Sequence, residues 1–326
     1  MNATEAAEKM GGYFWDDVQT AAATFTVGEQ DDGERLVYGG TPVALGDAMD
    51  SAARIAGLPS KVLGVFPPSI QVEMMNYLYS DLSSPPKAIM RSGEITYFTA
   101  TKASLCNPSD VINILQKTVG GTCDFERVYA SGEVVDLYCI GQKQEAVARG
   151  DLVSHGVWVS FAPFGGLSPD VAGYVNRLVC TNGMIATENL FRYRKPAGVE
   201  GNQYEWLSEY IPMAYTSCDR EVERLRELIG IELNGNREAA IANVLASVPG
   251  GLHDYIRNRI IEVNPRTMYD LICVVTEIAS HRLDNPRHIR SLMMAAGRLS
   301  SETSSCPVCH RAFGNGNGHS HESESG

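Results

Sequence analysis

The chain has 326 residues, of which 44% are hydrophobic and 20% are charged, and its formal net charge is −12. This composition is typical of folded globular proteins and excludes wholesale disorder and the fibrous classes. No apolar run reaches the roughly eighteen residues that a membrane-spanning helix needs. The acidic start "MNATEAAEKMGGYFWDD" also lacks the layout of a signal peptide, so we expect a cytoplasmic protein that does not bind membranes.

The acidic residues are concentrated toward the ends of the chain. Residues 1–60 contain ten Asp and Glu against three Lys and Arg, whereas residues 254–298 contain seven Arg against five acids. Net charge therefore does not attract this chain to nucleic acid, and any such binding needs a locally basic surface.

The eight cysteines are scattered except for one close pair near the C-terminus. This spacing is unlike the disulfide framework of small secreted proteins, so we expect the cysteines to be reduced.

The first sixty residues are predicted to form an acidic region of helices and loops. Within residues 14–57 we expect helical pieces, interrupted by "GEQDDGERLVYGGTP", whose Asp-Asp-Gly and Gly-Gly clusters indicate a loop or hairpin.

Residues 61–202 are predicted to form a β-rich core. The runs "KVLGVF", "KAIMR", "EITYFTAT", "FERVYA", "EVVDLYCIG" and "LVSHGVWVSFA" are short, rich in Val, Ile, Tyr and Phe, and bounded by turn residues. "RSGEI" and "ASGEV" are predicted hairpin turns. We therefore expect a mixed or antiparallel sheet over about residues 60–195.

Three Asn-Pro pairs predict helix starts, with asparagine as the N-cap and proline in the first helical position: Asn107-Pro108, Asn264-Pro265 and Asn285-Pro286. Apolar residues at helical spacing between 241 and 296 predict a helical region over residues 203–300. The fold class is thus predicted to be α+β, followed by a flexible tail at 301–326.

The tail contains a Cys-x2-Cys pair followed by two histidines. Cys306, Cys309, His319 and His321 supply the two thiolates and two imidazoles that a tetrahedral zinc needs, with His310 as a substitute ligand. The alternative is a disordered tail with incidental Cys and His, because His-x-His is tighter than the usual histidine spacing.

Cys180, within "RLVCTNGMIA", is either a nucleophile or a core residue beside a turn. A nucleophile needs a lowered thiol pKa and a base within reach, and His155 is the only histidine in the preceding β region. Asn182-Gly183 is a strong hairpin signal. We therefore favour a buried structural cysteine next to an Asn-Gly turn.

Signatures of common enzymes are missing from the sequence. We find no glycine-rich dinucleotide fingerprint, Walker loop, zinc-protease motif or nucleophile elbow. The chain is therefore predicted not to be an enzyme.

The stretch "ARGDLVSHGVWVSFAPFGGLSPDVAGYVNRLVCTNGMIA", from Ala148 to Ala186, resembles the central signature of a phage- and plasmid-borne family, domain of unknown function 932. The matching residues are Gly150, Asp151, Gly156, Arg177, Val179, Cys180, Thr181, Asn182, Gly183 and Met184. Here "SFAPFGG" replaces the family's usual segment at that point. The resemblance implies a mobile-element protein associated with nucleic acid, such as one that binds or anneals single strands in recombination or replication.

Single-strand binding needs cationic groups for the phosphates and aromatic platforms for the bases. The basic and aromatic run "NLFRYRKP", together with other arginines, supplies the predicted binding residues: Arg177, Arg192, Tyr193, Arg194, Lys195, Arg257 and Arg259, with Phe191 as a second platform. The alternative for that run is a strand edge protected by charge.

A second function stays open: a non-catalytic interaction or assembly protein of a phage, which binds proteins, acts on host defence or joins a particle. Self-association into a homo-oligomer is also left open.

Overall fold

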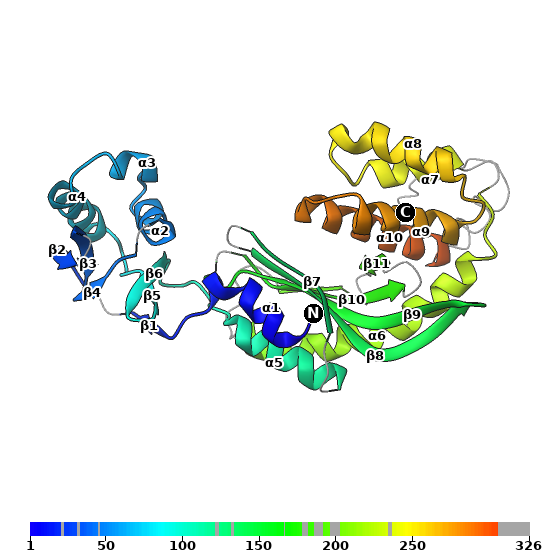
Figure 1. Ribbon diagram of the computed structural model, residues 1–326, viewed down its shortest axis with the longest axis horizontal. Coiled ribbons are helices and arrows are strands. Elements are labelled where there is room, and N and C mark those ends of the chain that lie inside the picture. The colour runs from blue at the N-terminus through cyan, green and yellow to red at the C-terminus, as the bar shows by residue number, and fades with distance from the viewer. Residues whose placement is uncertain are drawn as a thin grey trace, which may run out of the picture.

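A computed structural model describes residues 1–20, 23–30, 33–44, 46–120, 124–131, 134–165, 167–177, 182–185, 192–195, 203–233 and 237–305. Over these ranges the chain has an α+β fold whose three sheets pair their strands antiparallel, as the sequence predicted. Figure 1 shows a smaller N-terminal lobe beside a larger body of sheet and helices.

The N-terminal lobe contains two three-stranded sheets and three helices. One sheet has the order β2-β3-β4 and the other β1-β5-β6. The strands are β1 Asp17–Gln19, β2 Phe25–Gln30, β3 Gly33–Tyr38, β4 Thr41–Pro42, β5 Lys87–Arg91 and β6 Glu94–Thr99; the helices are α2 Asp47–Ile55, α3 Ser60–Leu63 and α4 Pro68–Ser80.

An aromatic core packs the two sheets and the helices of this lobe together. The rings of Phe25, Tyr38 and Phe98 pack against one another with centroids 4.8 to 5.9 Å apart. Aliphatic residues from 36 to 95 join the same core, which therefore continues across residue 60, where the sequence had placed a boundary. The hairpin indicated by "GEQDDGERLVYGGTP" was confirmed, because β2 pairs with β3 across it, whereas one local prediction was wrong: "KVLGVF" begins in helix α3 and not in a strand. A short apolar run suits a strand or a helix equally well, and periodicity cannot separate them.

The body is built on one six-stranded sheet with the order β11-β10-β9-β8-β7, in which β12 also pairs with β10. Its strands are β7 Asp124–Ser131, β8 Val134–Ala148, β9 Asp151–Phe161, β10 Asp170–Arg177, β11 Asn182–Ile185 and β12 Arg192–Arg194.

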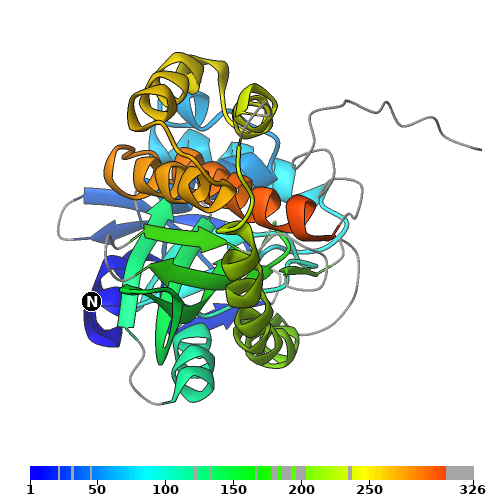
Figure 2. The same cartoon turned by 90° about the vertical axis from the view of Figure 1, so that its right-hand side faces the viewer.

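Helices cover both faces of this sheet. Figures 1 and 2 agree in placing α5 and α6 on one side and α9 and α10 on the other. The helices are α1 Ala3–Lys9, α5 Pro108–Val119, α6 Gln203–Leu228, α7 Arg237–Leu245, α8 His253–Val263, α9 Met268–His281 and α10 Pro286–Ser305, with short 3-10 turns η1 Gly11–Tyr13 and η2 Gly250–Leu252. Apolar side chains of α7 to α10 form the largest core together with Tyr138, Trp158 and Tyr174 of the sheet.

Local signals for turns and caps were confirmed in most places. Ser92 and Gly93 have φ angles of 51° and 83° and close the β5–β6 hairpin, and β7 pairs with β8 across the second predicted turn. Asn107 and Asn285 each accept a hydrogen bond from the backbone N–H two residues on, which starts α5 and α10.

Asn264-Pro265 does not start a helix, contrary to our prediction. Asn264 ends α8 in the left-handed conformation, with φ 55°. Helix α9 instead begins at a capping box in which Thr267 and Asp270 exchange hydrogen bonds. The reciprocal box satisfies two backbone donors, which a single asparagine cap cannot do.

The prediction of a turn at Asn182-Gly183 was also wrong. Both residues lie in strand β11, where Asn182 pairs with Arg177 and Gly183 pairs with Asn176. The hairpin exists, but its connection comes before this pair, so a turn conformation gives no reason for a glycine at 183.

Three further predictions concern the tail, the cysteines and membranes. Helix α10 continues to Ser305, so the predicted tail starts later than residue 301.

Cys139 is disulfide-bonded, which corrects the expectation of reduced thiols at this position. Within the described residues no helix has the length and apolarity to cross a bilayer.

Candidate nucleic-acid interface

Strand β12 places one predicted platform, Tyr193, on an aromatic surface. Side chains alternate along a strand, so Tyr193 points to the opposite face from Arg192 and Arg194. Its ring packs against Tyr210 of α6 with centroids 5.0 Å apart and planes 40° apart, and Tyr210 packs against Trp206 at 4.6 Å and 30°. Trp206 and Tyr210 are four residues apart on a helix and therefore share one face. We call these three partly exposed rings the aromatic ladder.

Two exposed arginines accompany the ladder. Arg194 follows Tyr193 on the same strand but points to the opposite face, whereas the Arg220 guanidinium is near enough to act electrostatically on Tyr193. Burial raises the pKa of Tyr193, and Arg220 partly opposes that shift. In the described part of the chain neither arginine forms an ion pair, so both guanidinium groups can meet an anion.

The other predicted cations are neutralised or buried. Arg192 forms an ion pair with Asp170, and its guanidinium lies 5.9 Å from the Trp158 ring centroid. Lys195 is only 5% exposed. Arg192 is therefore neutralised by Asp170, and the charge of Lys195 is hidden from a ligand.

On α8, Arg257 lies 3.1 Å from Glu238, and Arg259 lies 3.0 Å from Glu262 and 3.3 Å from Glu277. Each charge meets an acid of the chain itself. The predicted set is therefore not one site: Tyr193 lies on the ladder, and Arg194 is exposed on the opposite face of the same strand.

Arg177 belongs to a buried polar group that includes two residues of the family signature. Its Nε donates to Asp151 Oδ1 over 2.7 Å, and Tyr269 donates to Asp151 Oδ2 over 2.6 Å. Burial acts to raise the pKa of Asp151, but the hydrogen bonds from Arg177 and Tyr269 outweigh it and lower that pKa. The group ties β9 and β10 to α9. Arg177 thus has a structural role in this arrangement.

Sequence reasoning missed a second charged group, around His155. Its Nδ1 lies 3.2 Å from Asp219 and its Nε2 lies 3.4 Å from Glu145. The donor atoms of these three residues lie within 4.8 Å of one another, which suits a metal ion. Lys143 and Arg226 already pair with the two carboxylates, so the chain balances this charge by itself. The members come from β8, β9 and α6, and only pairing and packing bring them together.

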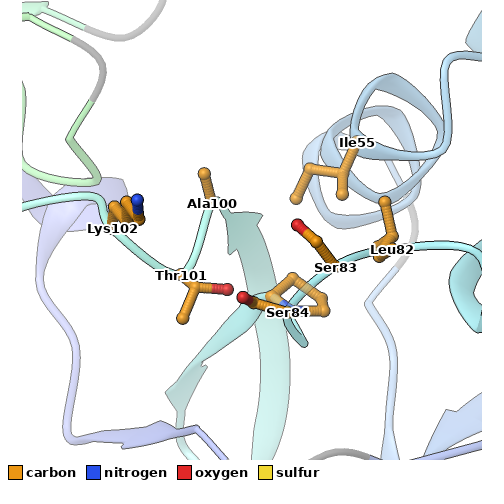
Figure 3. Close-up of a pocket in the computed structure, with 8 residues that line it drawn as sticks. Ile55, Leu82, Ser83, Ser84, Ala100, Thr101 and Lys102 are labelled. Carbon is orange, nitrogen blue, oxygen red and sulfur yellow. The ribbon is translucent and has the colours of Figure 1, made fainter.

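A hollow of about 470 Å³ opens in the N-terminal lobe (Figure 3). Ser84 and Thr101 turn their hydroxyls toward each other, and Lys102 stands at the side. The Thr101 hydroxyl already donates to the carbonyl of Pro85. With one lysine and short hydroxyls, this hollow lacks the convergent charges of a defined site.

The free thiols in the described ranges are poor nucleophiles. Burial raises the pKa of Cys218 to about 12 and that of Cys273 to about 11. A reactive thiol needs the opposite shift. Cys180 and Phe191, and the zinc ligands Cys306, Cys309, His319 and His321, lie outside the described residues, so the nucleophile and zinc questions stay as predictions.

No protein-family model, curated protein or solved structure matches this chain.

Proposed function

We propose that this protein binds single-stranded nucleic acid without catalysing a reaction on it, and that the bases stack on the aromatic ladder. The observation that carries this proposal is the run of three tilted, partly exposed rings with Arg220 near Tyr193, an exposed arginine that forms no ion pair with the described residues. Stacking on an aromatic side chain contributes about 1–3 kcal/mol per base, and it tolerates any base. Arg220 supplies a phosphate contact that a chain with net charge −12 otherwise lacks.

The setting of this activity rests on the family resemblance. A phage or plasmid protein that holds single strands serves recombination or replication, where annealing requires two strands to be kept unpaired and accessible. Binding along an extended strand favours several copies side by side, which fits the predicted homo-oligomer.

The test is the affinity for a labelled single-stranded oligonucleotide, measured by fluorescence anisotropy over a salt series that starts at about 50 mM. Trp206→Ala should weaken binding by about 5- to 150-fold, which corresponds to the loss of one stacked base. Arg220→Gln should weaken binding and lower the slope of log affinity against log salt, because fewer counterions are released.

Arg257→Gln is the matched control, because Glu238 already neutralises this arginine. It should leave both affinity and salt slope unchanged. Absence of binding at low salt would refute the proposal, and so would equal losses in the Arg220 and Arg257 variants.

One observation favours the alternative of a protein-binding or assembly function. Helices α3 and α4 and the link between them expose apolar side chains: Val62 is 43% exposed, Val65 79%, Ile70 41% and Tyr77 71%. Clustered apolar exposure of this kind is common at protein interaction surfaces. The surface lies in the N-terminal lobe, away from the ladder, so the two functions are compatible in one chain.

A further inference from the structure

Strand β8 bulges where it passes His155 of β9. The pairing of the two strands jumps from residues 140 and 156 to residues 144 and 154, so residues 141–143 lie opposite His155 alone. Extra residues in one strand bend it and redirect its side chains, and bulges are frequent beside functional sites. The bulge carries Lys143, whose ammonium lies 3.2 Å from the Glu145 carboxylate. The irregular pairing therefore gathers charged side chains around one histidine.

Tyr215 of helix α6 holds this arrangement in place. Its hydroxyl fills the space that a Cβ at residue 141 would need, so the bulge requires Gly141. Its ring meets the His155 ring edge to face, with centroids 6.4 Å apart and planes 71° apart. The imidazole is only 1% exposed, so packing sets its direction.

Both ring nitrogens of His155 point at carboxylates. Nδ1 lies 3.2 Å from Oδ1 of Asp219, and Nε2 lies 3.4 Å from Oε1 of Glu145. Nε2 is buried and forms no hydrogen bond with the residues that the structure describes, although a buried polar atom normally has a partner. A metal ion is a suitable partner, because it binds an imidazole nitrogen and a facing carboxylate oxygen at the same time. The carboxylate opposite Nε2 is then a second ligand of the same ion.

A cation already occupies the carboxylate side of this cluster. Lys143 Nζ donates to Oδ1 of Asp219 and lies 3.2 Å from Oε1 of Glu145, the same two oxygen atoms that face the imidazole. The Lys143 side chain is 45% exposed and the Asp219 side chain is 52% exposed, so this side is open to solvent. A flexible, strongly hydrated ammonium can turn outward at little cost. An ion can therefore reach the cluster from this side and take the place of the lysine.

The donor atoms of the cluster select the kind of ion. An imidazole nitrogen together with carboxylate oxygens suits Zn²⁺, whereas Mg²⁺ and Ca²⁺ prefer oxygen alone. The ligand atoms of the three residues lie within 4.8 Å of one another, so a small closing movement brings them to the roughly 2.0–2.2 Å that zinc requires. Among the described residues, no other group of three or more such donors is this close together.

We propose that His155, Glu145 and Asp219 bind a zinc ion, and that Lys143 is the resident cation that zinc displaces. Nε2 of His155 and one oxygen of each carboxylate are the protein ligands, and water completes the four-coordinate shell. Arg226, which lies 3.0 Å from Oε2 of Glu145, stays in place and orients that carboxylate. The zinc site does not depend on the nucleic-acid binding proposed above.

The test is the affinity of the full chain for Zn²⁺, measured by competition with a coloured zinc chelator after the protein has been stripped of metal. Every protein carries Cys306→Ser and Cys309→Ser, which remove the thiolates of the zinc site predicted near the C-terminus. One Zn²⁺ should bind per chain, and millimolar Mg²⁺ should not displace it. Absence of zinc binding, both in this protein and after Lys143→Met, would overturn the proposal.

His155→Gln and Asp219→Asn should each weaken zinc binding at least about tenfold, because each removes a ligand. The Asp219 side chain is half-exposed, so its variant keeps the fold even where His155→Gln destabilises it. Glu238→Gln is the matched control, since this carboxylate pairs with Arg257 on another surface, and it should leave zinc affinity unchanged. Equal zinc affinities in the Asp219→Asn and Glu238→Gln variants would refute the site.

Lys143→Met keeps most of the side chain and removes the ammonium. Zinc affinity should rise about tenfold or more, because a charge-assisted hydrogen bond no longer competes with the ion. A fall in zinc affinity would contradict the displacement of Lys143 by zinc. Trp206→Ala, which removes a ring of the ladder, should leave zinc affinity unchanged, so this proposal and the one for nucleic acid can fail separately.

Discussion

The two faces of the six-stranded sheet are built on different principles. The face toward α6 is almost wholly apolar: Leu137, Val157, Val159 and Val171 pack there, and His155 is the titratable group buried among them. The opposite face packs Tyr138, Trp158 and Tyr174 into the largest core, but it also carries a row of polar residues across three strands: Asp136 pairs with Ser160, and Ser160 pairs with Asp170.

The difference shows two ways of fixing a helix on a sheet. On the apolar face, α6 is held by close approach: a Cβ at Gly173 would lie 2.9 Å from the Ser217 hydroxyl and 3.0 Å from the Ala214 carbonyl oxygen. On the polar face, Arg290 of α10 donates to Asp136 over 3.4 Å and to Ser160 over 3.3 Å. The hydrogen bonds of Arg290 therefore add a directional contact to the apolar packing that holds α10 on this face.

The largest loss of stability is expected when a side chain is added where α6 approaches the sheet most closely. Gly173→Val places a branched side chain against α6 and should destabilise the protein by about 2–4 kcal/mol, although valine suits a strand. Urea unfolding measures the change. Gly250→Val is the control, because a Cβ there meets nothing within 4 Å. Similar losses in both variants would show that α6 can move away from the sheet.

An intermediate change in stability is expected when Asp136, on the face toward α10, is replaced. Burial raises the pKa of Asp136, while Arg290 and neighbouring donors oppose the shift. A raised acid pKa gives stability that is fully present below the unfolded value of 3.8 and is lost as pH rises through the folded value. The stability advantage of the wild type over Asp136→Asn should therefore shrink between pH 4 and pH 7. An advantage that grows with pH would mean that Arg290 dominates.

The smallest effect is expected for His155. Burial lowers the pKa of this imidazole, Lys143 and Arg226 add to the shift, and Glu145 and Asp219 oppose it. A histidine with a lowered folded pKa stays neutral, so the native state loses stability once pH falls below the unfolded value of 6.5. From pH 8 to pH 5.5 the wild type should therefore lose more stability than His155→Gln, by under about 1 kcal/mol. Thermal melts at both pH values give the comparison. A pH dependence identical in the two proteins would indicate that the carboxylates balance the burial.

The distance along the chain over which an interaction acts explains how much could be predicted from the sequence. The α+β class, the Ser92-Gly93 hairpin and the caps at Asn107 and Asn285 depend on residues within a few positions of each other, and these predictions were confirmed. Asn264 failed because a stronger capping box lies three residues further along the chain. Tyr193 and Arg194 were identified as a basic and aromatic pair, but Trp206 and Tyr210 of the ladder were not, since nothing in their own segment marks them.

The sequence alone determined the local conformations of this protein, because φ restrictions, caps and apolar periodicity act over one or two turns of chain. Only the tertiary structure decided which charges are free. Arg177 and Arg257 look no different from Arg194 in the sequence, yet Asp151 and Glu238 neutralise the first two. The physical reason is that a charge is cancelled by whatever lies within a few ångströms in space, and strand pairing and helix packing set that distance across many residues of chain.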